Sequence, residues 1–348
     1  MEEIHRILDH IDSSVQRDVL ATIIHVEGSA YRKEGTSMLF REDGTQVGVL
    51  SAGCLEEDLS IRVQEMRAED GPQMSIFDMR SYDDLSWGQG AGCNGVIHVL
   101  LEPIDVRLRQ HLSALKFYLE AGKTVMMVKK LTDGLAVSGY LFFAEGQLPF
   151  GEWQGIIPDE VKGLQAEWKV SGHKSGIAFI PELDESFYLH CFRPKPRLVV
   201  FGAGMDAVPL VKLAAQTGFS VTVCDWRPAF CHKSHFPDAN QLIIGFPQET
   251  VNQLQLTPDD FVMILTHQFQ RDHELLQLLM KQKLRYLGVL GSKSRTSRLL
   301  GGKEIPDSIH TPVGLPIGAE GPMEIAVSIV SQLIQIYRKR DVGKVISA

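Results

Sequence analysis

The sequence predicts an α/β protein with a mixed α+β N-terminal domain and a C-terminal Rossmann-like domain built on a doubly wound parallel sheet. A chain of 348 residues exceeds what one hydrophobic core usually organises. Two prolines in segment 192–197 remove backbone donors and helical angles that a regular element needs. Regular alternation of short apolar runs and helical patterns begins only after this segment. We therefore expect domains at 1–191 and 198–348, joined by a proline-rich linker at 192–197.

The first domain is predicted to open with a helix and continue mainly as strands. Four apolar residues share one helical face near the N-terminus: Ile4, Ile7, Leu8 and Ile11. Apolar and β-branched runs predict strands at 19–26, 38–40, 47–50, 74–79, 96–101, 125–128 and 135–143. Asp43-Gly44 and Asp133-Gly134 are hairpin turn signals between neighbouring runs. These elements define a mixed domain but leave its strand order open.

The second domain alternates strands with helices. Short buried strands are expected at 198–201, 219–224, 242–244, 261–265 and 286–290. Helical patterns cover 207–216, 272–282, 292–300 and 322–337. Strands separated by helices imply parallel crossover connections, and hence a doubly wound sheet.

Charge and composition exclude several classes of protein. The formal net charge is -8, which opposes a general affinity for nucleic acid or an anionic membrane. The N-terminus lacks a basic segment followed by an apolar one, and no apolar run approaches the ~18 residues of a membrane span. Five cysteines without a CxxC pair argue against a disulfide framework or a structural zinc site. We expect a cytoplasmic protein with reduced thiols.

A glycine-rich turn follows the first strand of the second domain. Gly202 and Gly204 match the G-x-G-x-x-G/A pattern, whose backbone approaches a phosphate at a helix start. Asp225 ends the next strand about 20 residues later, where a carboxylate accepts hydrogen bonds from ribose hydroxyls. Asp206 places a negative charge within the turn, and Arg227 suits an extra phosphate. Two interpretations stay open: an NAD(P) site, and a Rossmann scaffold that no longer turns over a dinucleotide.

Two other strand ends are expected at the same edge of the sheet. His267 follows the strand at 261–265, while Ser292, Lys293 and Arg295 open the helix after the strand at 286–290. Hydroxyls and cations at a helix start are typical of an anion site. The alternatives are a strand-end histidine without ligand, a helix-capping Ser292 and solvated charges.

Two glycine-flanked cysteines distinguish the first domain. Gly53 precedes Cys54 at the start of a helical pattern, and Gly92 precedes Cys93 in a loop with four glycines. A thiolate binds soft metals, and glycines let the backbone approach a ligand closely. The acidic residues after Cys54 oppose strong activation of its thiol. The alternative for each cysteine is a small buried apolar residue.

Taken together, these residues resemble the XdhC/CoxI family, the accessory proteins of molybdenum hydroxylases such as xanthine dehydrogenase. The resemblance covers nearly the whole chain. It rests on eight ordered blocks: Gly28–Gly35, Ser51–Glu56, Trp87–Gly95, Val200–Gly204, Val223–Pro228, Thr266-His267, Tyr286–Lys293 and Pro312–Ala319. The chain departs from the family pattern at Met205, where histidine is usual, and at Ala52, where a second glycine is common.

The resemblance implies a chaperone that holds the molybdenum cofactor, promotes its sulfurated form and delivers it to the apoenzyme. Cys54 and Cys93 would then face the molybdenum–sulfur end, and the helix start at Ser292 would receive the phosphate. The implied partners are a molybdenum hydroxylase and a cysteine desulfurase as sulfur donor. An apolar helix at 325–336 favours a homodimer.

Three hypotheses for function follow. The first is the cofactor-binding chaperone, an accessory protein rather than an enzyme. The second is an NAD(P)-dependent oxidoreductase, for which His267 is the proton donor nearest the cofactor edge. The third is an interaction protein that recruits the sulfur donor and the hydroxylase without binding a small molecule.

Overall fold

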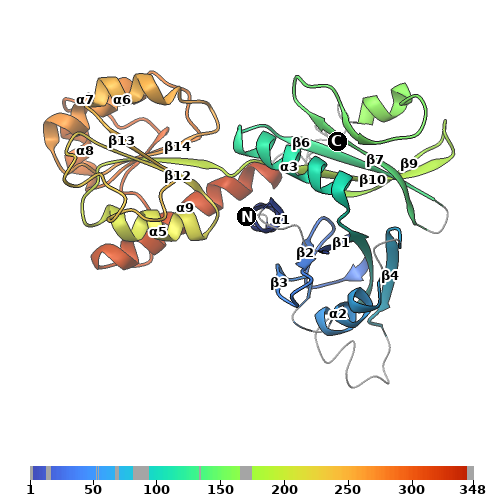
Figure 1. The fold of residues 1–348 in the computed structure, drawn as a ribbon. Helices are drawn as coiled ribbons and strands as arrows, with labels where there is room; N and C mark the ends of the chain where they lie inside the picture. Colours follow the sequence, from blue (N-terminus) through green and yellow to red (C-terminus); the bar gives the residue numbers. More distant parts are fainter. Residues whose placement is uncertain are drawn as a thin grey trace. The chain divides into compact units, whose positions relative to one another are not determined.

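The chain folds into two compact units, Glu2–Pro194 and Lys195–Ala348 (Figure 1). The structure, a computed structural model, describes residues 3–12, 17–51, 53, 55–66, 70–80, 94–132, 135–164 and 175–342. The last strand of the first unit ends at Phe192, and the first strand of the second unit begins at Arg197. The first unit contains two antiparallel sheets, and the second contains a parallel one.

The first sheet has the strand order β3-β2-β1-β5-β4 and is antiparallel throughout. Its strands are β1 (Val19–Ser29), β2 (Ser37–Phe40), β3 (Gln46–Val47), β4 (Gln73–Asp78) and β5 (Asn94–Pro103). Helix α2 (Glu56–Glu65) covers one face, because Leu55 and Leu59 are buried against Ile97 and Val99. The predicted hairpin at Asp43-Gly44 connects β2 and β3.

The second sheet has the order β8-β7-β6-β10-β9 and is also antiparallel. Its strands are β6 (Val125–Leu131), β7 (Val137–Ala144), β8 (Phe150–Glu152), β9 (Ser175–Ile180) and β10 (Glu185–Phe192). The last three of these strands were not predicted from the sequence. The Asp133-Gly134 turn lies outside the described residues.

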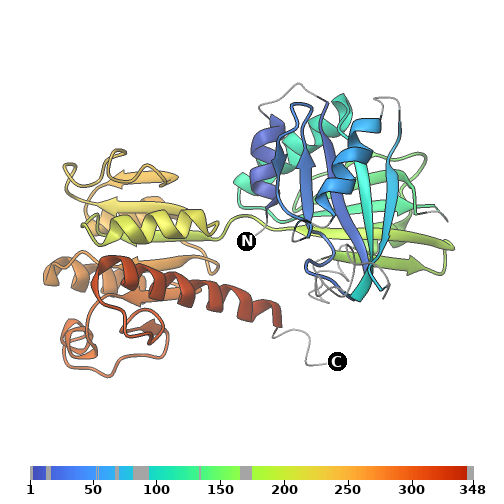
Figure 2. The same cartoon turned by 90° about the horizontal axis from the view of Figure 1, so that it is seen from below.

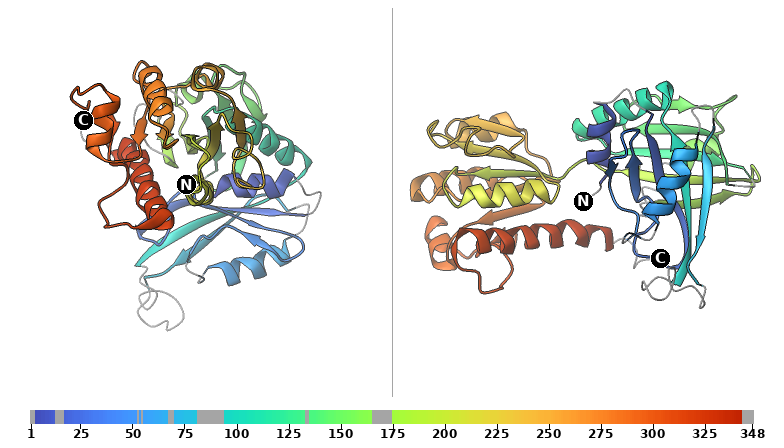
Figure 3. Two further views of the ribbon diagram at one scale, coloured as in Figure 1. Left: turned by 90° about the vertical axis from the view of Figure 1, so that its left-hand side faces the viewer. Right: turned by 60° about the horizontal axis from the view of Figure 1, so that its bottom comes forward.

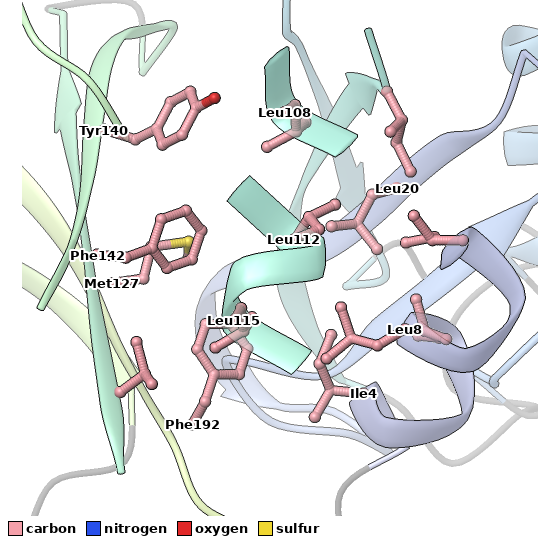
Figure 4. Close-up of a cluster of buried hydrophobic side chains, with 14 of the residues drawn as sticks. Ile4, Leu8, Leu20, Leu108, Leu112, Leu115, Met127, Tyr140, Phe142 and Phe192 are labelled. Carbon is pink, nitrogen blue, oxygen red and sulfur yellow. The ribbon is translucent and has the colours of Figure 1, made fainter. Parts of the chain in front are cut away.

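One hydrophobic core joins both sheets to helices α1 (Ile4–Asp12) and α3 (Val106–Glu120). Figure 4 shows Ile4 and Leu8 of α1, Leu112 and Leu115 of α3, and Phe142 of β7 meeting in this core. Helix α3 was not predicted, although Leu108, Leu112, Leu115 and Leu119 have helical spacing. Asp105 caps this helix by accepting a hydrogen bond from Leu108 N at 2.7 Å.

A buried ion pair crosses this core. Lys129 of β6 donates to Glu102 of β5, and each side chain is only 4% exposed. The other carboxylate oxygen of Glu102 has no hydrogen-bond partner within the described part of the chain. A cavity of about 20 Å³ adjoins the pair and is also lined by Thr22, Ser37 and His190. Because buried charges are expensive unless paired, Lys129 and Glu102 depend on each other.

The second unit is a six-stranded parallel sheet with the order β13-β12-β11-β14-β15-β16. Its strands are β11 (Arg197–Phe201), β12 (Ser220–Asp225), β13 (Gln241–Ile244), β14 (Phe261–Ile264), β15 (Tyr286–Val289) and β16 (Ile309–His310). Its helices are α5 (Ala207–Gln216), α6 (Pro247–Leu254), α7 (Phe269–Leu279), α8 (Lys293–Leu299) and α9 (Gly321–Val342). The predicted doubly wound parallel sheet is therefore confirmed.

Helices cover both faces of this sheet (Figures 2 and 3). Residues of α5 and α9 form one core with Val200 and Val223, while residues of α6, α7 and α8 form another with Val199 and Val262. Helix α6 and strand β16 were not predicted, and α7 begins three residues earlier than expected. Among the described residues, no helix is both long and apolar enough to cross a membrane.

Candidate functional site

The carboxyl edge of the parallel sheet carries most of the predicted site residues. Strands β11 and β14 are neighbours, and the helices that follow them, α5 and α7, pack on opposite faces. The strand order therefore reverses between β11 and β14, and ligands of doubly wound sheets bind at such a switch point. The loops that follow these two strands define the candidate site.

Gly202 opens the turn between β11 and α5. Its φ of +116° is unfavourable for other residues, and an added Cβ atom would lie 2.4 Å from the carbonyl oxygen of Leu265. Glycine is therefore required here because the loop after β14 passes directly against the turn. At Gly204 an added Cβ would lie 2.8 Å from a carboxylate oxygen of Asp206.

Asp225 accepts hydrogen bonds from two residues of its own chain. Oδ2 accepts from Ala203 N and Arg227 Nη2, each at 2.8 Å. Oδ1 accepts from Arg227 N and Nε, each at 2.9 Å. Burial acts to raise the pKa of Asp225, but the hydrogen bonds from Arg227 and Ala203 outweigh it and lower the pKa. A carboxylate accepts about four hydrogen bonds, and here Ala203 and Arg227 together donate four to Asp225.

Asp206 and His267 meet across the switch point. His267 Nε2 lies 2.5 Å from Asp206 Oδ2. His267 has a φ of +57°, which is uncommon for a residue with a Cβ atom. The predicted charge of Asp206 in the turn is thus paired with an imidazole from the neighbouring loop. The contact joins two residues that are 61 positions apart, and no local pattern in the sequence pairs them.

Ser292 and Lys293 lie at the start of α8 and are exposed. The Ser292 hydroxyl accepts from Arg295 N at 3.2 Å, which is the capping interaction that we considered as the alternative. Arg295 donates to buried Asp272 at 2.5 Å, so its guanidinium ties α8 to α7. Of the two cations predicted to contact an anion here, Lys293 is exposed, whereas Arg295 is paired with Asp272.

A group of aromatic and arginine side chains lies beyond Asp225 and was not predicted. We call it the edge stack, and it consists of Trp226, Arg227, Phe230, Phe246 and Arg271. Arg227 Cζ lies 4.3 Å from the ring centroid of Phe230 and 4.6 Å from that of Trp226. Arg271 Cζ lies 4.8 Å from the centroid of Phe246 and 5.9 Å from that of Trp226. In the sequence, the feature that could have indicated this group is the set of aromatic residues just after β12 and β13.

Gly53 lies in the first unit, in the loop before α2. It has a φ of +109°, and an added Cβ would meet no atom within 4 Å. Glu56 holds this loop by accepting from Leu50 N at 3.0 Å and Ser51 N at 2.7 Å. Burial acts to raise the pKa of Glu56, but the hydrogen bonds from the Ser51 hydroxyl and backbone lower it overall. Cys54 lies outside the described residues.

Gly92 and Cys93 also lie outside the described residues, which resume at Asn94. The start of β5 is tightly paired with the end of β1. An added Cβ on Gly95 would lie 2.3 Å from the carbonyl oxygen of Glu27, and one on Gly28 would lie 2.7 Å from that of Asn94. These two glycines therefore allow the ladder to continue up to the predicted cysteine loop.

Two cysteines of the second unit are buried, whereas Cys191 on β10 is half-exposed. Cys224 is buried in β12, and Cys231 is buried with its thiol 3.6 Å from Val223 O. Burial raises the pKa of both thiols. Within the described residues no group of three or more His, Cys, Asp or Glu side chains has the geometry of a metal site.

The fold defines the class: a two-sheet antiparallel domain followed by a Rossmann-type domain. Family models match in the same order: the XdhC and CoxI family at residues 13–83, the BH1974-like central domain at 106–193, and the XdhC Rossmann domain at 198–333. The chain belongs to the XdhC and CoxI family, which confirms the resemblance seen in the sequence.

Individual relatives agree with this assignment. A probable xanthine dehydrogenase subunit of Bacillus subtilis (strain 168) is 44% identical, covering 98% of this chain and 99% of that protein. The molybdenum cofactor insertion chaperone PaoD of Escherichia coli (strain K12) is 25% identical, covering 93% and 85%. The crystal structure of a xanthine dehydrogenase (BH1974) from Bacillus halodurans has a TM-score of 0.85 and 50% identity, covering 98% and 97%.

Proposed function

We propose that this protein binds the molybdenum cofactor and delivers it to a molybdenum hydroxylase of the xanthine dehydrogenase type. The observation that carries this proposal is the likeness to a molybdenum cofactor insertion chaperone over 93% of the chain. The likeness to a probable xanthine dehydrogenase subunit over nearly the full length supports the choice of client.

We further propose that Cys54 and Cys93 contact the molybdenum–sulfur end of the cofactor. Thiolates suit a soft metal centre. Glu56 accepts from Ser51 N and so holds the chain around Cys54, and the tight β1–β5 pairing holds it at Gly95, just after Cys93. On this proposal the protein retains the sulfurated cofactor, and a cysteine desulfurase is the sulfur donor.

Taken by itself, the second unit offers its own proposed cofactor contacts, which are residues at the carboxyl edge of the parallel sheet. The exposed ammonium of Lys293 is a counter-charge for the phosphate, and Ser292 positions the start of α8. The Gly202 turn, Gly204 and the Asp206–His267 pair line the switch point, where ligands of this fold bind.

Cofactor content of the purified protein tests this proposal. The full chain is expressed in molybdate-fed cells, and molybdenum is measured by elemental mass spectrometry and the oxidised pterin by fluorescence. We expect both in the wild-type protein and a several-fold decrease in Cys54→Ala and Cys93→Ala. Cys191→Ala, a half-exposed cysteine on β10, is the matched control and should keep the wild-type content. Absence of molybdenum and pterin from the wild-type protein, even after incubation with isolated cofactor, would contradict the proposal.

One alternative function is an NAD(P)-dependent oxidoreductase, because the Gly202 turn has the form of a dinucleotide-binding turn. This alternative needs Asp225 to exchange its hydrogen bonds with Arg227 for bonds to a ribose. Titration of the protein with NADH, followed by nicotinamide fluorescence, separates the two functions. Tight binding with turnover would favour the oxidoreductase, whereas no binding leaves the Rossmann domain to another ligand.

A further inference from the structure

The edge stack alternates aromatic rings with guanidinium planes. Arg227 lies over both Phe230 and Trp226, while Arg271 lies over both Phe246 and Trp226. These five residues come from the connection after β12, the start of α6 and the first turn of α7. Three segments far apart in the sequence therefore place their flat side chains together at the carboxyl edge.

Both cations of the edge stack are already paired. Arg227 donates two side-chain hydrogen bonds to Asp225, and Arg271 Nη1 lies 2.9 Å from Glu274 Oε2. A free phosphate would therefore gain little attraction here. What remains available to a ligand is the flat surface of the aromatic rings, since Phe230 is 40% exposed and Phe246 is 46% exposed. Exposed aromatic residues grouped at a ligand-binding edge favour a flat partner over an ion.

We propose that the edge stack binds a fused nitrogen heteroaromatic ring, the chemical class that includes pterins and purines. Such a ring stacks on aromatic and guanidinium planes, and its ring nitrogens and oxygens accept from the guanidinium N–H groups left free by Asp225 and Glu274. Trp226 holds the edge stack together, because both arginines lie over its ring beside the exposed rings of Phe230 and Phe246. The inference rests on the proposed function for its choice of a pterin as the natural occupant.

Titration of the full chain with biopterin and, separately, with adenosine tests the proposal. Both probes carry the fused ring without phosphate or metal, so the signal reports the ring alone. We expect biopterin fluorescence to be quenched on binding. Trp226→Leu should lower the association constant about tenfold or more, whereas Trp226→Phe, which keeps a flat ring, should lower it less. Arg338→Ala is the control, because Arg338 is an exposed arginine over the ring of Tyr337 on α9.

Each outcome decides one point. Biopterin binding that is weakened in Trp226→Leu but not in Arg338→Ala supports a pterin site. Adenosine binding with the same dependence on Trp226, without biopterin binding, supports the ring site and assigns it to a nucleotide base. No binding of either probe, or equal binding by the wild type and folded Trp226→Leu, overturns the inference.

The proposed function and this inference fail separately. If wild-type protein carries the cofactor and Trp226→Leu carries the same amount, the chaperone function stands and the edge stack is not the ring site. If wild-type protein carries no cofactor but binds biopterin through Trp226, the ring site stands and the chaperone function fails. Melting curves by circular dichroism confirm that each variant is folded.

Discussion

His267 Nε2 lies 2.5 Å from Asp206 Oδ2, and this contact joins the turn after β11 to the loop after β14. The two residues are 61 positions apart in the sequence. They meet because β11 and β14 are adjacent parallel strands whose carboxyl ends lie at one edge.

This pair should contribute little to stability. The side chain of His267 is 60% exposed, and exposed contacts of this kind contribute about 0 to 1 kcal/mol even between full charges. We expect Asp206→Asn to lower the free energy of unfolding by less than about 1 kcal/mol, measured by urea denaturation. A loss above about 2 kcal/mol would show that the contact is a structural support of the switch point.

Gly202→Ala should destabilise the Rossmann domain strongly. The added Cβ would lie 2.4 Å from the backbone oxygen of Leu265, in addition to the strain of a φ of +116°. We expect a loss of about 3 kcal/mol or more in the unfolding transition of this domain. Gly301→Ala is the matched control, since Gly301 also has a positive φ but no atom within 4 Å. It should cost about 1 kcal/mol, and equal losses would contradict the steric argument.

Removing one partner of the buried Lys129–Glu102 pair should be costly. Lys129→Met leaves a buried carboxylate without its counter-charge, and we expect a loss of about 3 to 5 kcal/mol. The double variant Lys129→Met/Glu102→Leu should recover most of this loss. Lys162→Ala, which removes an exposed pair with Asp159, should leave the denaturation midpoint unchanged. If the double variant is as unstable as Lys129→Met, the loss does not come from leaving the Glu102 carboxylate without a counter-charge.

Asp225 should make the Rossmann domain less stable in acid. Its pKa in the folded state is lowered below 3.8, so the folded state binds fewer protons than the unfolded state. The resulting stabilisation is present above the unfolded pKa and is lost as the pH falls through the folded pKa. The stability difference between wild type and Asp225→Asn should therefore shrink from pH 7 to pH 3. Urea midpoints at several pH values provide the measurement, and a constant difference would contradict the assigned role.

Thiol reactivity should separate the buried cysteines from the others. Burial raises the pKa of Cys224 and Cys231, so little thiolate forms near neutral pH. We expect iodoacetamide at pH 8 to leave both unmodified in the native protein and to modify both in urea, as determined by peptide mass spectrometry. Modification of Cys224 at the same rate in both states would show that β12 opens readily.

Local patterns were sufficient for much of the second unit. The helix predicted at 207–216 has those bounds in the structure, because a glycine turn precedes it and Ala207, Leu210, Val211 and Ala214 share one buried face. Helix α3 was not predicted, although its leucine spacing and the Asp105 cap are both visible in the sequence and indicate a helix. Strand β16 has two residues, too few for a pattern to be recognised.

The sequence singles out candidate residues but not their contacts with one another. Asp225 lies at the end of β12 beside the glycine turn, as its place in the motif predicts, and its hydrogen bonds with Arg227 were not predicted. The edge stack was missed because its aromatic residues lie singly after separate strands. Only the order of those strands brings Trp226, Phe246 and Arg271 together.

The sequence by itself determined the Rossmann-type class, the family and the positions of the glycine turn and its acidic partner, because these depend on residues close together along the chain. Only the tertiary structure decided which side chains pair with one another: Asp225 with Arg227, Asp206 with His267, and Lys129 with Glu102. The physical reason is that charge pairing and stacking act through space over a few ångströms. Such distances are set by strand order and layer packing, which a local pattern does not contain.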